Sequence, residues 1–112
     1  MSWNITENGN LVTVAFEGRL VAAVAPDLRD DVMGKMCEGT NILFDLSKMT
    51  HIDSSGLGVL VQILQKAKSV GGKVVLAELQ QGPKIVFDIT KVCRVFEIVP
   101  TVAEATEKYR IM

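Results

Sequence analysis

The sequence predicts an α/β protein with a mixed sheet of four or five strands, an N-terminal β-hairpin and about four helices. Two short, almost continuously apolar runs, residues 41–46 and 73–77, are typical of strands buried on both faces of a parallel sheet. The residues between these runs have helical spacing, and strands that alternate with helices favour parallel pairing. The chain has 112 residues and 48% hydrophobic content, enough for one core, so residues 1–112 are expected to form a single domain.

The first elements are expected to be the hairpin and a helix. Residues 4–17 alternate loosely, with a strand over residues 11–16 that follows a turn at residues 7–10. Pro26 suits the first turn of a helix, which Gly39 is expected to end. The apolar residues that recur at helical spacing within it are Leu28, Val32, Met33 and Met36.

The central helix is expected to follow the strand at residues 41–46 and to run from about residue 54 to residue 70. Gly71 and Gly72 come directly after it, and a glycine there can adopt the left-handed conformation that caps a helix. The next strand is expected over residues 73–77.

The last third of the chain contains three more expected elements. Pro83 opens a short helix that runs to about residue 90, and a final strand is expected over residues 94–99. Thr101 is expected to cap a helix over residues 102–109, with Glu104 completing a capping box.

The composition excludes several classes of function. The 12 basic and 13 acidic residues are mixed along the sequence and give a net charge of -1, so no basic face for direct nucleic-acid binding is expected. No apolar run approaches the roughly 18 residues that a membrane span needs. The N-terminus lacks the basic and apolar regions of a secretory signal, so the protein is expected in the cytoplasm.

No cofactor or metal site is expected. One histidine and two scattered cysteines, Cys37 and Cys93, do not form a metal-binding set, and both cysteines are expected to be reduced and buried. Gly56 and Gly58 begin a dinucleotide-binding pattern, but Val61 occupies the third glycine position and no strand is expected immediately before the segment.

Enzymatic activity is not expected either. His51, Asp53 and Ser54 lie together at the entry to the central helix and suggest a hydrolase triad. Residues so close in sequence rarely adopt the orientation that a triad needs, and no oxyanion donors can be identified. His51 is therefore interpreted as a loop histidine.

The run at residues 53–58 stands out. Asp53, Ser54 and Ser55 are good capping residues for a helix start, so capping alone could explain them. Capping does not explain Gly56 and Gly58, since each costs up to about 1 kcal/mol relative to alanine in a helix, and a purely structural role is not expected to select both. Gly58 is expected to face outward and to leave the backbone open to a close-approaching partner, on a face that it shares with Gln62, Gln65 and Ser69.

The opposite face of this helix is expected to pack on the core. It consists of Leu57, Leu60, Val61, Leu64 and Ala67. Val59, Ile63 and Val70 widen the apolar arc, and a neighbouring helix is expected to cover them.

The sequence Asp53-Ser54-Ser55-Gly56-Leu57-Gly58 resembles the signature of the STAS domain, and in particular of the bacterial anti-sigma factor antagonists. The likeness spans nearly the whole chain, and the order of elements agrees with a STAS fold. The other segments that carry it are residues 42–46, Gly72-Lys73, Pro83, residues 96–98, Thr101 and Glu104-Ala105.

The resemblance implies a function. In that family, the serine directly after the Asp is phosphorylated by a partner that is both a serine kinase and an anti-sigma factor, which corresponds to Ser54 here. The unphosphorylated antagonist binds this partner and frees a sigma factor, and a serine phosphatase resets the switch. The residues implied in partner binding are Asp53, Ser54, Ser55, Gly56, Leu57 and Gly58.

One position departs from the family pattern. The family commonly has an Asp in a Gly-x-Leu-Asp run near the end of the second strand, whereas this chain has Val21 after Gly18-Arg19-Leu20. An acid that helps to engage the kinase would be missing here.

Two alternatives remain open at this point. The chain could be a STAS module in a transporter or another signalling complex without a sigma factor, although its initiator Met and its ends favour a free-standing protein. It could also be a response-regulator receiver in which Asp45, near the end of a buried strand, is the phosphoacceptor. That fold needs an acidic pair after its first strand, and residues 12–23 offer none.

Overall fold

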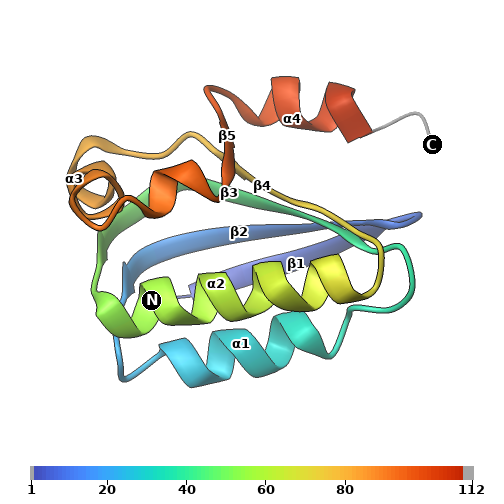
Figure 1. Cartoon of the computed structure of the whole chain (residues 1–112), viewed down its shortest axis with the longest axis horizontal. Helices are drawn as coiled ribbons and strands as arrows, with labels where there is room; N and C mark the ends of the chain where they lie inside the picture. Colours follow the sequence, from blue (N-terminus) through green and yellow to red (C-terminus); the bar gives the residue numbers. More distant parts are fainter. Residues whose placement is uncertain (1, 110–112) are drawn as a thin grey trace.

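The computed structural model describes residues 2–109 and arranges five strands in one sheet with helices on both faces (Figure 1). Strands β1 and β2 are antiparallel, and the pairs β2–β3, β3–β4 and β4–β5 are parallel. The predicted mixed sheet with an N-terminal hairpin is therefore confirmed. The strands, which neighbour one another in chain order, are β1 (Ser2–Asn8), β2 (Leu11–Leu20), β3 (Asn41–Ile52), β4 (Val74–Ala77) and β5 (Glu97–Val99).

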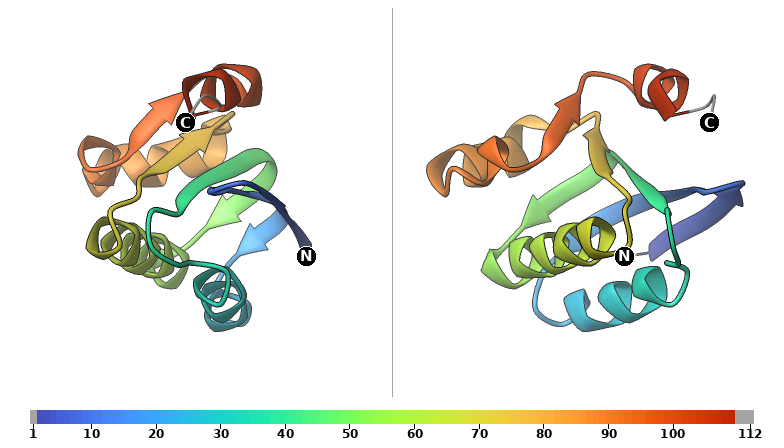
Figure 2. Two further views of the ribbon diagram at one scale, coloured as in Figure 1. Left: turned by 90° about the vertical axis from the view of Figure 1, so that its right-hand side faces the viewer. Right: turned by 45° about the vertical axis from the view of Figure 1, so that its right-hand side comes forward.

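The helices form two layers around this sheet. Figures 1 and 2 show α1 and α2 side by side on one face, α4 over the other face, and α3 at the end of the sheet where β3 finishes. Val59 and Ile63 of α2 are buried in the same core cluster as Leu28 and Val32 of α1, which agrees with the expected cover by a neighbouring helix. The helices are α1 (Ala25–Met33), α2 (Ser54–Ser69), α3 (Gln81–Ile89), the 3-10 helix η1 (Val92–Arg94) and α4 (Val102–Tyr109).

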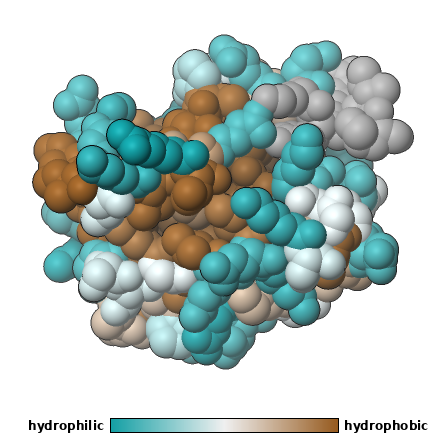
Figure 3. Space-filling view, in the orientation of Figure 1, coloured by the Kyte–Doolittle hydropathy of each residue, from teal (hydrophilic) through white to brown (hydrophobic). Residues whose placement is uncertain are grey.

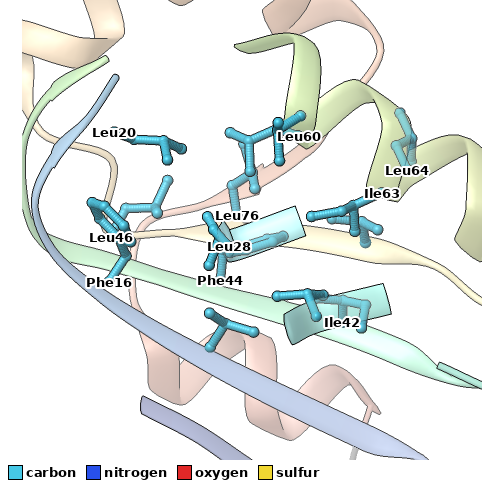
Figure 4. Close-up of a cluster of buried hydrophobic side chains, with 14 of the residues drawn as sticks. Phe16, Leu20, Leu28, Ile42, Phe44, Leu46, Leu60, Ile63, Leu64 and Leu76 are labelled. Atoms are coloured by element: carbon cyan, nitrogen blue, oxygen red, sulfur yellow. The ribbon is translucent and has the colours of Figure 1, made fainter. Parts of the chain in front are cut away.

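The main hydrophobic core lies between the sheet and the pair α1–α2. Figure 4 shows side chains of β2, β3 and β4 that meet the inner faces of both helices. A second, smaller cluster lies on the other face of the sheet, where Ala105 of α4 is buried against Leu43 and Val75. Strands β3 and β4 are therefore buried on both faces, as their continuous apolar runs predicted.

Strand β3 is longer than predicted, because it continues from Leu46 to Ile52. Its pairing with β4 stops at Asp45, whereas its pairing with β2 continues to the pair Leu20–Ile52. Beyond Asp45 one side of the strand has no neighbouring strand, so polar residues are tolerated there and the apolar run ends before the strand does. The expectation that no strand immediately precedes the central helix is wrong.

Helix α1 is shorter than predicted. It ends at Met33, with Gly34 as the C-cap, and not at Gly39. Glycine is a poor helix former, and the next turn is closed by Thr40, whose hydroxyl accepts a hydrogen bond from the Cys37 N–H at 2.9 Å. Met36 still packs against the core from this turn, which explains its helical spacing in the sequence.

Strand β5 is also shorter than predicted, because residues 92–95 form a turn of 3-10 helix before it. Lys91 adopts a left-handed conformation with a φ of 61°, and the Val95 N–H donates to the Val92 carbonyl. The chain becomes extended only at Glu97.

Two of the expected capping residues are confirmed, Gly71 at the end of α2 and Thr101 at the start of α4. Gly71 follows α2 with a φ of 79°, the left-handed conformation predicted there. Thr101 Oγ accepts a hydrogen bond from the Glu104 N–H at 3.1 Å at the start of α4. Within the described chain, residues 2–109, no helix combines the length and the apolar character needed to cross a membrane.

We expect Asn41→Leu to destabilise the protein by about 1–3 kcal/mol, because the buried Asn41 joins the starts of three strands. The leucine variant loses the hydrogen bond from the Lys73 N–H to the Asn41 Oδ1, which measures 2.9 Å, whereas the backbone N–H of residue 41 still donates to the Asn10 carbonyl. Asn41→Asp is the matched control, since it keeps a side-chain acceptor and should cost less. Urea unfolding measures both, and equal losses would contradict this role.

Candidate functional site

The predicted motif lies where α2 begins. Asp53 is the N-cap residue, with extended backbone, and its Oδ1 accepts a hydrogen bond from the Gly56 N–H at 2.9 Å. The Leu57 N–H donates to the Asp53 carbonyl at 2.9 Å and starts the helical ladder. The capping role predicted for this run is confirmed for Asp53.

The second carboxylate oxygen of Asp53 reaches a different part of the chain. Oδ2 accepts a hydrogen bond from the Ala22 N–H at 3.1 Å, in the segment that joins β2 to α1. The Asp53 N–H donates in turn to the Leu20 carbonyl at 3.2 Å. One residue thus fixes the end of β2, the entry to α1 and the start of α2 relative to one another.

Gly56 is required by close packing. A Cβ on this residue would overlap the Leu20 carbonyl oxygen and would lie 2.8 Å from the Leu20 Cγ and 2.9 Å from the Ile52 Cγ1. Leu20 and Ile52 are both buried, so they cannot move aside freely. The inference that structure alone would not select the two glycines is therefore wrong for Gly56.

Gly58 has no such constraint, because a Cβ there would meet nothing within 4 Å. It lies one turn into α2 and is exposed, as predicted, together with Ser54 and Ser55. Leu57, in contrast, is buried in the core.

The six residues of the motif therefore separate into two groups. The anchoring group, Asp53, Gly56 and Leu57, holds α2 on the sheet. The exposed group consists of Ser54, Ser55 and Gly58. The exposed group presents its side chains or open backbone to another molecule, whereas Gly56 and Leu57 are buried and Asp53 is half-buried.

The segment between β2 and α1 is a neighbour of the motif that the sequence did not identify. Its Ala22 is bonded to Asp53, and both Ala22 and Ala23 are exposed. Val21, which departs from the family pattern, is half-buried at the start of this segment. Val21, Ala22 and Ala23 thus give the surface beside Ser54 small apolar side chains that carry no charge. Local sequence patterns carried no signal for this contact, because it joins residues far apart in the chain.

The residues considered for other chemistry have different roles. His51 is exposed in β3 and not in a loop, and its Nδ1 lies 3.1 Å from the Thr50 hydroxyl. Asp45 lies in the middle of β3, where its carboxylate accepts from the Ser47 N–H, and not near the strand's end. A receiver phosphoacceptor at a strand end is not formed by this arrangement.

The two cysteines are free thiols, but the expectation that both are buried is wrong. Cys37 is exposed in the turn after α1, and Cys93 is half-buried in η1. Among residues 2–109, no group of three or more His, Cys, Asp or Glu side chains is arranged to hold a metal ion.

The fold and the site define a known class of protein. The STAS domain family model matches residues 2–105, and the chain therefore belongs to the STAS domain family. This match confirms the resemblance found in residues 53–58 and in the order of elements.

Two individual proteins, one relative by sequence and one solved structure, are also similar to this chain over most of its length. The chain is 28% identical over 95 residues to the anti-sigma-B factor antagonist of Bacillus subtilis, which covers 85% of this chain and 87% of that protein. A crystal structure of a Thermotoga maritima protein, 28% identical, superposes with a TM-score of 0.87 over 96% of this chain and 94% of that chain.

The fold is also shared with SpoIIAA, an anti-sigma factor antagonist of known structure. Its unphosphorylated form is 18% identical and has a TM-score of 0.76 over 99% of this chain and 100% of that chain. The phosphorylated form of the Bacillus SpoIIAA has a TM-score of 0.72 at 18% identity, over 96% of this chain and 98% of that chain.

We expect Gly56→Ala and Gly58→Ala to have opposite effects on stability. Gly56→Ala forces a Cβ against the Leu20 backbone and should destabilise the protein by about 1–3 kcal/mol. Gly58→Ala should be neutral or stabilising by up to about 1 kcal/mol, because alanine is the better helix former and the space is open. Urea unfolding of both variants measures the difference. A loss for Gly58→Ala as large as that for Gly56→Ala would contradict this assignment.

Asp53→Ala should destabilise the protein by about 0.5–2 kcal/mol through loss of the cap. It also removes the acceptor of the Ala22 N–H, so amide hydrogen exchange at Ala22 should become faster. Asp53→Asn is the matched control, since it keeps one oxygen that can cap Gly56. Unchanged exchange at Ala22 in the alanine variant would contradict the bridging role.

Proposed function

We propose that this chain is an anti-sigma factor antagonist in which phosphorylation of Ser54 controls partner binding. The proposed partner is an anti-sigma factor that is also a serine kinase. Binding by the unphosphorylated chain releases a sigma factor, and a serine phosphatase reverses the modification. Residues 1–112 act in this proposal as one STAS domain in the cytoplasm, by binding and without catalysis of its own.

The observation that carries the proposal is the position of Ser54. It directly follows the N-cap Asp53, it is exposed, and it lies beside the exposed Ser55 and Gly58. The Bacillus subtilis relative is named an anti-sigma-B factor antagonist, and SpoIIAA, which shares the fold, has both an unphosphorylated and a phosphorylated form. These names support the same kind of regulation in this chain.

A phosphate at Ser54 is compatible with the fold. It brings about -1.5 to -2 charges to the start of a helix, where unpaired N–H groups and the helix dipole favour negative charge by about 0.3–1 kcal/mol. The Asp53 carboxylate still accepts hydrogen bonds from the Gly56 N–H and the Ala22 N–H, and Gly56 remains packed on Leu20. The helix should therefore stay formed, and the switch acts on the binding surface.

The surface around Ser54 suits a partner that approaches closely. Ser54 is small, Gly58 exposes backbone one turn later, and Ala22 and Ala23 add an uncharged neighbour. A phosphate in such an interface would lose its water and would repel any acidic group opposite. Binding should therefore weaken on phosphorylation without a change of fold.

Val21 bears on the choice of partner. It lies on the segment that Asp53 fixes next to Ser54, so the acid common in the family would stand on the same surface. In this proposal, the cognate kinase contacts a neutral side chain there. A kinase that depends on the family acid would recognise this chain poorly.

We expect a cognate kinase to add one phosphate to the chain, at Ser54. Incubation with ATP and candidate kinases from the same genome, followed by intact mass measurement, detects the modification. Ser54→Ala should abolish it, whereas Ser55→Ala, which alters an exposed neighbour, should leave it in place. Phosphopeptide mapping that placed the phosphate on Ser55 or Asp45 would refute the assignment.

We also expect phosphorylation to change affinity and not stability. Thermal melting of the phosphoprotein and of the unmodified chain should give matched melting temperatures, because the helix dipole accommodates the charge. Titration against the kinase should then show weaker binding by the phosphoprotein. A melting temperature lowered by several degrees, or an unchanged affinity, would overturn the mechanism.

A further inference from the structure

A second surface of the molecule carries apolar residues that the proposed function does not use. Among residues 2–107, the exposed large hydrophobic side chains are Ile85 and Ile89 of α3, Val95 after η1, and Ile98 of β5, with exposed fractions of 58%, 74%, 54% and 37%. All four fall within a short stretch of the chain. Figure 3 shows an apolar area over α3 and the front of the sheet, in the orientation of Figure 1. A contiguous apolar area of this kind marks an interaction surface.

Two hollows flank the edge strand β5. The first, of about 320 Å³, lies between α3 and β5, and Ile98 contributes to its wall. The second, of about 360 Å³, lies between the C-terminal half of α2 and the segment that leads into β5, and Val95 contributes to its wall. The first is lined by Leu79, Lys84, Asp88, Cys93, Ile98, Val99 and Pro100, and the second by Leu64, Lys68, Gly72, Lys73, Val74, Val95 and Glu97. We call the four exposed apolar residues and these hollows the β5 surface.

Positive charge predominates on the β5 surface. The cationic residues that line the hollows or lie between residues 84 and 98 are Lys68, Lys73, Lys84, Lys91 and Arg94, and the acidic ones are Asp88 and Glu97. Lys84 donates to Asp88 at 2.9 Å, and this hydrogen bond raises the pKa of Lys84 and lowers that of Asp88. The whole chain has a net charge of -1, so the cations are concentrated here. This local excess was not visible in the sequence, where basic and acidic residues are mixed.

The second hollow of the β5 surface is separate from the Ser54 site. Leu64 and Lys68 of the second hollow follow Ser54 by ten and fourteen positions in α2. At the helical rise, these positions lie about 15–21 Å along the helix from Ser54. A molecule bound in this hollow therefore has no need to contact Ser54.

We propose that the β5 surface binds an acidic segment of a partner protein, which places two apolar side chains in the hollows on either side of Ile98. The hollows are of a size typical of sites that hold buried ligand groups, and apolar anchors in such pockets dominate protein interfaces. The surrounding cations match negative charge on the segment and would steer it to the surface.

Two other occupants fit these observations less well. A second copy of this chain, placed about a two-fold axis, would bring the same cations against themselves. A bilayer is a broad surface, whereas the apolar features here include two discrete hollows.

The test uses short, blocked peptides and the isotope-labelled full chain. We expect a peptide in which leucine alternates with glutamate to shift the amide resonances of Lys73, Val95 and Ile98 with a saturable dependence. A peptide in which leucine alternates with lysine should bind at least about tenfold more weakly, because the cations of the β5 surface repel its positive charge. Lys73→Glu should weaken the glutamate peptide by a similar factor. Lys48→Glu is the matched control, since it makes the same charge change at an exposed β3 residue away from the β5 surface.

Several outcomes would overturn the proposal. They are the absence of saturable shifts at millimolar peptide, equal binding of both peptides, and shifts at residues 54–58 in place of those at β5. Binding of anionic phosphatidylglycerol vesicles or of duplex DNA through the same residues would assign the surface to a membrane or a nucleic acid. Concentration-dependent dimerisation that shifts Ile98 would assign it to a second copy. If Lys73→Glu lowers the melting temperature, Ile98→Ser replaces it in the comparison.

Discussion

The carboxylate of Asp53 accepts hydrogen bonds from two backbone amides that belong to different parts of the chain. One bond, from the Gly56 N–H, starts α2, and the other, from the Ala22 N–H, fixes the segment between β2 and α1. Gly56 then allows the first turn of α2 to rest directly on the Leu20 carbonyl at the end of β2. The position of the candidate site depends on these three contacts, because they join the sheet, α1 and α2 at one point.

This arrangement separates stability from recognition within one short motif. Asp53, Gly56 and Leu57 hold the helix in place, so Ser54 and Gly58 are free to differ in chemistry without affecting the fold. A modified serine on such a support changes the charge of a surface and leaves the backbone beneath it unchanged. The second hollow of the β5 surface lies farther along α2, so a group bound in that hollow does not need to contact Ser54.

The sequence predicted the features that depend on neighbouring residues. The start of α2 and the cap at Asp53 follow from local patterns, and both are present. The family resemblance at residues 53–58 also follows from the sequence alone, and the STAS family match agrees with it. Contacts between distant segments were not predictable in this way. The bond between Ala22 and Asp53 depends on how β2 and β3 align.

The length of β3 could not be predicted for a similar reason. Its last residues pair only with β2, and polar residues separate the buried Leu46, Met49 and Ile52 there, so this part does not show the continuous apolar run of a buried strand. The packing role of Gly56 was missed because Leu20 belongs to another strand. The cations of the β5 surface come from α2, the start of β4, α3 and the region around η1, and the fold brings them together.

The central claim is that phosphorylation at Ser54 changes a surface while the Asp53 contacts stay intact. Amide hydrogen exchange at Ala22 and Gly56, compared between the unmodified and the singly phosphorylated protein, tests this most directly. The account predicts equal protection of both amides in the two forms. Loss of protection at either amide on phosphorylation would contradict it, because the modification would then act by releasing the support beneath Ser54.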